Sequence, residues 1–249
     1  MSLARIALRI AAVEAIKGRT LVEDNVLDSP NGALDIQANG TLRTPEDRPF
    51  VAVFTDTGKA EDITGRSLVE NGVCELVIES GISLAMTVVD QETGASEMVG
   101  VSIPASDGGF EFFLDIVQRE IVEALTDPNN EWAEIYRRLH YRVTKIEIGA
   151  RRTTDDGQRV AGHQVRISVA LMDDPVRGEP LEAGSPLADF LDKLQASDSL
   201  VYQEQAATMR RFIEGSAPNR TILQRRQGLT APEMAALAPG VTEDDAGDA

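Results

Sequence analysis

Few side chains in this sequence could carry chemistry, and two histidines and a cysteine are the first of them. His140 precedes one strand of an expected hairpin and His163 lies on the partner strand, so the two imidazoles could meet in space. A metal site built on them would still need a carboxylate such as Glu147, and two partly exposed strand histidines are the simpler interpretation. Cys74 lies in an apolar strand beside Glu75. Burial and a neighbouring carboxylate both raise the pKa of a thiol, which favours a core residue over a nucleophile.

A pair of carboxylates on one strand is the second candidate. Glu75 and Glu79 fall on the same face of an alternating run, at a separation conceivable for a glycosidase pair. Aromatic residues make up only 4% of the chain, and nothing else indicates a sugar-binding cleft. We interpret the pair as a solvated or interface-facing acidic strip. Because the sequence also has no Walker loop, GxGxxG, GxSxG or HExxH motif, we expect no enzymatic activity, no cofactor and no metal site.

Composition narrows the function classes further. The 249 residues are 42% hydrophobic and 26% charged, which is typical of a soluble globular protein. Asp and Glu number 41 against 24 Lys and Arg, giving a formal charge of −17 that disfavours a sequence-reading DNA or RNA binder. One cysteine excludes an internal disulfide and a multi-cysteine zinc site. No run reaches the about 20 apolar residues of a membrane span, and residues 1–17 lack a signal-peptide core, so we expect folding in a reducing cytoplasm.

Arginines cluster at two places in this acidic chain. Such asymmetry favours docking of an acidic surface on the basic surface of a neighbour. Intramolecular ion pairing is an equal alternative, and nucleic-acid binding competes without the aromatic residues that it would need. The first cluster contains Arg137, Arg138, Arg142, Arg151 and Arg152, and the second contains Arg210, Arg211, Arg225 and Arg226.

The periodicity of apolar residues predicts the elements that must position these groups. An amphipathic helix is expected over residues 3–17, with Ser2 as its cap, and a buried strand over 50–55 that Thr57-Gly58-Lys59 ends. A long strand covers 73–89, with a bulge or bend at Gly81, and residues 90–109 form a loop or hairpin insertion. Helices over 110–125 and 131–139 and a hairpin of 142–152 with 159–171 complete this part.

The composition changes after Met172. A linker leads to three expected helices, and the chain closes on a small, acidic, disordered segment. The helices cover 186–194, 200–214 and 231–237, and the acidic segment covers 243–249. We therefore predict an α+β fold, a largely antiparallel sheet with helices packed on it, over residues 1–172. Residues 173–249 are expected to form the linker, a helical C-terminal extension and the tail.

The local sequence of the first half resembles that of a known protein family. The N-terminal helix ends in Lys17-Gly18-Arg19-Thr20, then comes Asn25-Val26-Leu27-Asp28-Ser29, and after a polar loop Arg48-Pro49-Phe50-Val51-Ala52-Val53-Phe54-Thr55. This order resembles the tail terminator, or tail completion, proteins of long-tailed bacteriophages, of the minor tail protein U type. The resemblance covers about residues 3–171. The extra residues at 29–47 and 90–109 and the extension after Met172 depart from the family pattern.

The resemblance implies a structural virion protein located in the tail or neck, and in the host cytoplasm during assembly. It implies a homohexameric ring that caps the tail tube, stops its elongation and joins the tail to the head connector. Its partners would be further copies of itself, the tail tube protein, the head–tail connector protein and genomic DNA that passes through the lumen without sequence-specific binding. We expect no membrane among its partners. From the net charge and the charged clusters we add the hypothesis that certain side chains line the lumen of this ring or the interfaces between its subunits. These candidates are Glu75, Glu79, Arg137, Arg138, Arg151 and Arg152.

Three other functions fit the sequence. The first is another phage neck protein, such as a head-completion or connector subunit. The second is a cytoplasmic α+β hydrolase or small-ligand enzyme, which a pocket with convergent polar groups would favour. The third is an adaptor or chaperone that holds a partner with the helical extension.

Overall fold

The computed structural model divides the chain into two compact units. It describes residues 2–30, 48–61, 63–83, 87–89, 96–98, 101–104, 106–155 and 158–237. The first unit comprises Met1–Lys59 and Asn71–Met172, and the second comprises Ala60–Glu70 and Asp173–Ala249. The expected loop over 29–47 and the acidic tail over 243–249 fall largely or wholly outside the described residues.

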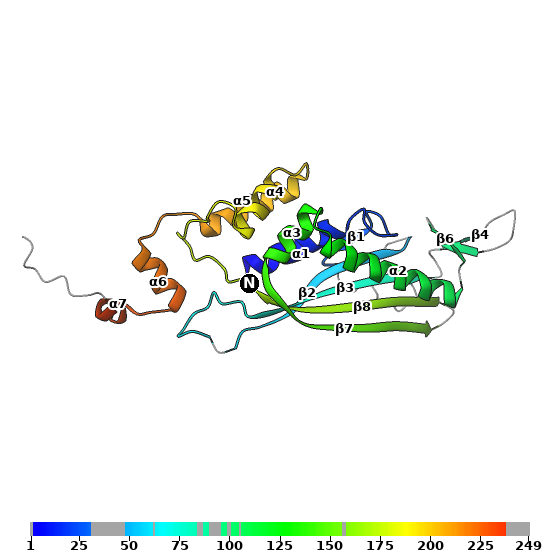
Figure 1. The fold of residues 1–249 in the computed structure, drawn as a ribbon, viewed down its shortest axis with the longest axis horizontal. Coiled ribbons are helices and arrows are strands. Elements are labelled where there is room, and N and C mark those ends of the chain that lie inside the picture. The colour runs from blue at the N-terminus through cyan, green and yellow to red at the C-terminus, as the bar shows by residue number, and fades with distance from the viewer. Residues whose placement is uncertain are drawn as a thin grey trace, which may run out of the picture. The chain divides into compact units, whose positions relative to one another are not determined.

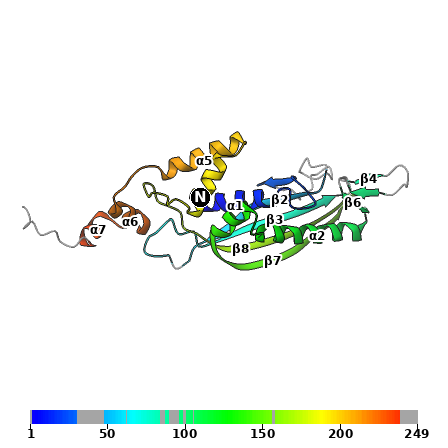
Figure 2. The ribbon, with the colours of Figure 1, turned by 45° about the horizontal axis from the view of Figure 1, so that its top comes forward.

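A five-stranded sheet is the framework of the first unit. Its strand order is β1-β2-β3-β8-β7, and every neighbouring pair is antiparallel except the parallel pair β1 and β2. Figures 1 and 2 show three helices, α1, α2 and α3, on one face of this sheet. The predicted α+β class with helices packed on a largely antiparallel sheet is confirmed. The strands are β1 (Val26–Asp28), β2 (Phe50–Lys59), β3 (Val73–Ser83), β7 (His140–Asp155) and β8 (Gln158–Leu171).

The three helices follow from capping and apolar spacing. α1 (Leu3–Ile16) begins where the Ser2 hydroxyl accepts from the Arg5 amide at 3.1 Å, and it fully buries Leu8, Ile10 and Ile16. α2 (Asp107–Thr126) buries Phe113, Leu114 and Val117. α3 (Glu131–Arg138) begins at Asn130, whose side-chain oxygen accepts from two backbone amides. These helices supply the core that covers the sheet.

Three details of the strands differ from the sequence-based expectations. β2 continues four residues beyond Thr55, the expected last residue, because a register shift between Thr55 and Gly58 lets it pair with β3 as far as Lys59. Gly81 makes no bulge, since β3 pairs with β8 in unbroken register from Val73 to Ser83. The strand expected over 73–89 is divided, since β3 ends at Ser83 and β4 (Thr87–Val89) belongs to a second, small antiparallel sheet with β5 (Ser96–Met98) and β6 (Val101–Pro104) of the insertion.

The second unit is helical among its described residues. α4 (Pro186–Gln195) and α5 (Leu200–Ile213) begin at capping serines, and α7 (Ala231–Leu237) follows the expected capping box of Thr230 and Glu233. α6 (Asn219–Gln227) was not expected, because it has no side-chain cap and buries no residue. Its end packs on the segment 60–70, where the Arg66 amide donates to the Gln227 carbonyl at 3.2 Å.

Gly228 makes this contact possible. Its φ of +64° is left-handed, and a Cβ there would overlap the Arg66 backbone. The same segment is joined to α7 by an ion pair between Arg66 and Glu233. The hydrogen bonds from Thr230 and the Arg66 ion pair lower the pKa of the Glu233 carboxyl to about 2.

Candidate assembly surface

The outer strand of the main sheet is long and lacks a second neighbour among the described strands. β7 pairs only with β8, so its outer backbone N–H and C=O groups form an open edge of up to 16 residues. The opposite edge strand, β1, has only three residues. Native proteins usually shorten, charge or cover such edges because an open edge pairs readily with another chain. β7 is therefore the strand best suited to contact a further subunit.

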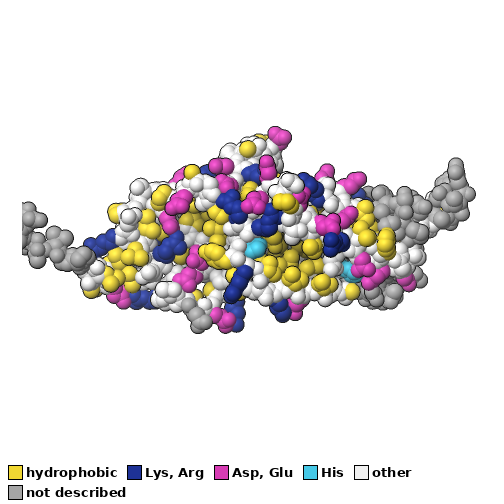
Figure 3. Space-filling view, viewed as in Figure 1, with side chains coloured by type: hydrophobic (Ala, Val, Ile, Leu, Met, Phe, Trp, Pro, Cys, Tyr) yellow, Lys and Arg dark blue, Asp and Glu magenta, His cyan; other side chains and the backbone are white. Residues whose placement is uncertain are grey.

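β7 also leaves apolar side chains open on the helix-covered side of the sheet. Val143, Ile146 and Ile148 lie opposite Val169, Ile167 and Val165 of β8, whose side chains are buried. The three β7 side chains are nevertheless 45%, 59% and 63% exposed, because α2 packs over β8 and β3. Hydrophobic side chains gather over this part of the molecule in Figure 3. We call Val143, Ile146 and Ile148 the β7 patch.

The two candidate glutamates lie on the other face of the sheet and belong to a paired network. Glu75 and Glu79 flank the position opposite Arg166 of β8. The Arg166 Nη1 donates to Glu75 at 3.1 Å and to Asp56 at 3.1 Å, and its Nε donates to Gln164 at 2.8 Å. Gln164 in turn donates to Glu79 at 2.5 Å, and Glu79 is only 6% exposed. The shared face was correctly predicted, but the network neutralises part of the acidic strip.

Removal of Arg166 should destabilise the first unit. Arg166→Ala leaves Glu75 and Asp56 without their shared cation, and we expect the free energy of unfolding to fall by about 1–3 kcal/mol. The control is Arg119→Ala, which breaks an exposed i,i+4 pair on α2 and should change stability by less than about 0.5 kcal/mol. Urea denaturation followed by circular dichroism measures both. Equal losses in the two variants would contradict the network.

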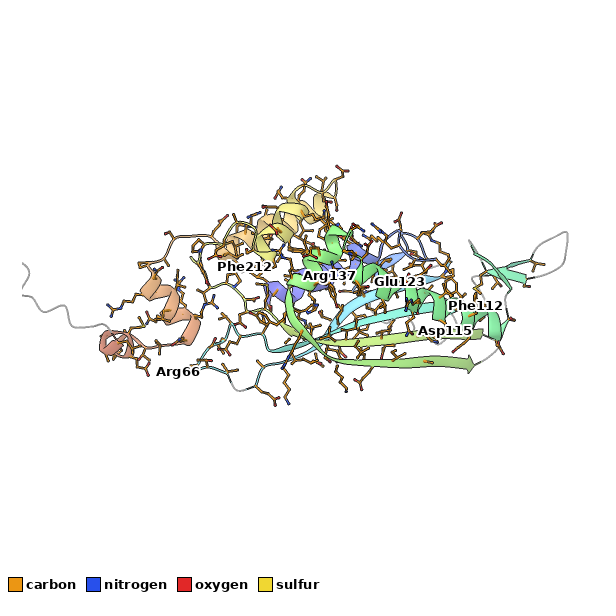
Figure 4. The ribbon with its side chains drawn as sticks, viewed as in Figure 1. Arg66, Phe112, Asp115, Glu123, Arg137 and Phe212 are labelled. Atoms are coloured by element: carbon orange, nitrogen blue, oxygen red, sulfur yellow. The ribbon has the colours of Figure 1, made fainter. Side chains whose placement is uncertain are left out.

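The candidate arginines separate into different environments. Arg137 holds the end of α2, since its Nη1 donates to the carbonyls of Leu125 and Asp127 at 3.0 and 3.2 Å. Its Nη2 also donates to Glu134 at 2.8 Å, so Arg137 has a structural role within α3 (Figure 4). Arg138 is exposed at the end of the same helix. The backbone of Arg151 and Arg152 belongs to β7, but their side chains lie outside the described residues.

The two histidines do not meet, which corrects the first metal hypothesis. His140 pairs with Leu171 and His163 pairs with Ala150, so they occupy distant positions of the hairpin. Glu147 lies opposite Arg166 and forms an ion pair with Lys145 at 2.8 Å. His140 is partly exposed, as expected, whereas His163 is buried. Cys74 is a core residue, 2% exposed, and burial raises the pKa of its thiol.

Burial of His140 should make stability depend on pH. Both ring nitrogens are buried without a hydrogen-bond partner, and desolvation lowers the pKa of the imidazole. The unfolded chain therefore binds a proton first as pH falls below about 6.5, and the stabilisation is lost as pH falls through the lower folded pKa. His140→Phe, which keeps a ring beside Tyr136, should lose less stability between neutral and acidic pH than the wild type. Urea midpoints across that range test this, and parallel curves would contradict it.

The second unit contains an open pocket near the end of α5. The lining residues that could bind a ligand are Glu179, Arg210 and Glu214. Glu179 already binds Arg226 through both carboxylate oxygens at 2.6 and 2.7 Å, and Arg210 pairs with Asp192. Two of the three charged lining residues, Glu179 and Arg210, are therefore engaged in ion pairs within the second unit.

No protein-family model matches this sequence, and no curated protein shows significant similarity to it. Among the helices of the described residues, none combines the length and apolar character needed to cross a bilayer.

Proposed function

We propose that this chain is a structural virion protein that assembles into a ring, caps the phage tail tube, stops its elongation and joins the tail to the head connector. The observation that carries the proposal is the β7 patch on an open strand edge of the first unit. The element order of the resemblance supports the choice of partner, which is a second copy of this chain. Six copies are the number that the resemblance implies.

The β7 surface suits a heterologous interface. Exposed isoleucines beside an unpaired edge bind best to a different, complementary patch on the neighbour, and repetition of such a contact closes a ring when the rotation per subunit permits. Burial of each isoleucine contributes about 1.5–3 kcal/mol. Lys145 and Glu147, exposed on the opposite side of β7, add charges that can select the neighbour.

The charge of the chain suits passage of DNA through such a ring. A formal charge of −17 per chain gives an assembly that repels phosphate, so DNA would slide through without adhering. In the single chain, Glu75 and Glu79 are bound to Arg166 and Gln164, so they contribute little to the repulsion of DNA. Other carboxylates would then supply most of the negative potential of the lumen.

A genetic experiment tests this function. In a phage that encodes this chain, a nonsense mutation in the gene should produce overlong tails and unjoined heads. A wild-type copy should restore normal particles, and a copy with Ile146→Glu and Ile148→Glu should not. Particles of normal tail length and infectivity from the nonsense mutant would contradict the proposal.

A second function, an adaptor that holds a partner through the C-terminal helices, is favoured by exposed apolar residues on α5. Leu200, Val201 and Phe212 are 72%, 61% and 64% exposed. Phe212→Glu separates the two functions. An adaptor would lose its partner, whereas a ring built on β7 should keep its mass and its activity in particle assembly.

A further inference from the structure

A buried histidine lies between two carboxylates where α2 crosses β8. His163 of β8 places its Nε2 3.3 Å from Glu111 Oε1 and its Nδ1 3.8 Å from Asp115 Oδ1. One nitrogen or oxygen from each of the three residues falls within 4.8 Å of the others. The two carboxylates are four residues apart on α2, so one helix face presents both toward the strand. Figure 4 labels Asp115 on α2.

The imidazole has an unused polar atom at this position. The His163 side chain is only 8% exposed, and its Nδ1 has no hydrogen-bond partner. A distance of 3.8 Å from Asp115 is too long for a hydrogen bond. A buried nitrogen without a partner is costly and needs a physical explanation.

The geometry points to a binding site for one divalent transition-metal ion formed by Glu111, Asp115 and His163, and we propose zinc-like ions as its ligand. An ion with ligands at about 2.0–2.2 Å in tetrahedral geometry separates them by about 3.4 Å. One imidazole nitrogen would bind the ion, and side-chain rotations would shorten the present separations, which are at most 4.8 Å, to that value. An imidazole nitrogen with two carboxylate oxygens suits Zn²⁺, Co²⁺ or Mn²⁺. Ca²⁺ prefers six to eight oxygen ligands, and Mg²⁺ prefers an all-oxygen octahedron.

The alternative for these residues is an ion pair between a protonated His163 and the two carboxylates. Such a pair needs no metal and gives no spectroscopic signal from Co²⁺. The metal site leaves at least one coordination position for water, because the chain supplies three ligands. It is independent of ring assembly, since both α2 and β8 belong to the first unit of a single chain.

Titration of the full-length chain tests the site. After treatment with a chelator, the protein should bind one equivalent of Zn²⁺ in calorimetry, and Co²⁺ should give visible d–d absorption bands of a site with nitrogen and oxygen ligands. Asp115→Asn changes a side chain that is 66% exposed, and it should weaken Zn²⁺ binding by at least about tenfold without unfolding the protein. His163→Gln should remove the Co²⁺ bands.

Two control variants make the result specific. Glu123→Gln alters another exposed carboxylate of α2, and His140→Phe removes the other histidine; both should bind Zn²⁺ as the wild type does. The proposal is overturned if the wild type binds no Zn²⁺ at one equivalent. It is also overturned if Asp115→Asn and His163→Gln both bind Zn²⁺ with unchanged affinity.

Discussion

Ile146→Glu combined with Ile148→Glu should convert the proposed ring into folded monomers. The two side chains are 59% and 63% exposed in the single chain, so charges there cost the monomer little. In an interface each isoleucine contributes about 1.5–3 kcal/mol, and two buried carboxylates oppose association further. Because about 1.4 kcal/mol corresponds to a tenfold change, association should weaken by at least about a hundredfold. Mass photometry measures the distribution of species.

Phe212→Glu is the matched control for this double substitution. Phe212 has a similar exposed fraction, 64%, but lies on α5 of the second unit. It should leave the assembly intact. Far-ultraviolet circular dichroism of both variants should match the wild type, and loss of association in both would show that charge alone, rather than the β7 patch, governs assembly.

The second large effect concerns the packing of α2. Phe113→Ala should lower the free energy of unfolding by about 3–5 kcal/mol, because Phe113 is fully buried and its removal leaves a cavity under the helix. The adjacent Phe112 is 58% exposed and is labelled in Figure 4. Phe112→Ala should change stability by no more than about 0.5 kcal/mol. Urea denaturation compares them, and a larger loss for Phe112→Ala would contradict the helix orientation.

Local sequence patterns predicted most of the helices and strands, because capping and the spacing of apolar residues act over only a few residues. The apolar spacing of residues 3–16 and the Ser2 hydroxyl are sufficient to predict α1. Alternation also predicted the hairpin of β7 and β8. The predicted end of β2 was wrong, because the turn-forming residues at 57–59 pair with β3. Local propensity does not include such a contact.

Long-range contacts explain the features that sequence patterns could not predict. The segment Ala60–Glu70 joins the second unit through α6 and α7, more than 150 residues away in the case of Arg66 and Glu233. α6 has no buried face, so no periodic apolar signal marks it. Its end alone has a local signal, because Arg225 and Arg226 in the last turn followed by Gly228 at the cap are typical of a helix C-terminus.

In the candidate sites, too, local patterns predicted some features and long-range contacts determine the others. Alternation placed Glu75 and Glu79 on one face, but only the register of β3 against β8 brings Arg166 and Gln164 to them. The cluster at His163 could not be predicted from local patterns, because its residues come from two elements, α2 and β8, that are far apart in the sequence. The sequence does show that Glu111 and Asp115 are an i,i+4 acidic pair beside the apolar stripe of a helix. It does not show that His163 of β8 lies next to them, because that depends on how α2 packs on the sheet.

The most direct test of ring assembly is the mass of the full-length chain in solution, alone and mixed with purified tail tubes, beside the Ile146→Glu, Ile148→Glu variant. We predict one discrete species of six 26.9 kDa chains for the wild type, free or bound at tube ends, and monomers for the variant. A wild-type protein that stays monomeric in both conditions, or a variant that still forms the same closed species, would contradict assembly through β7.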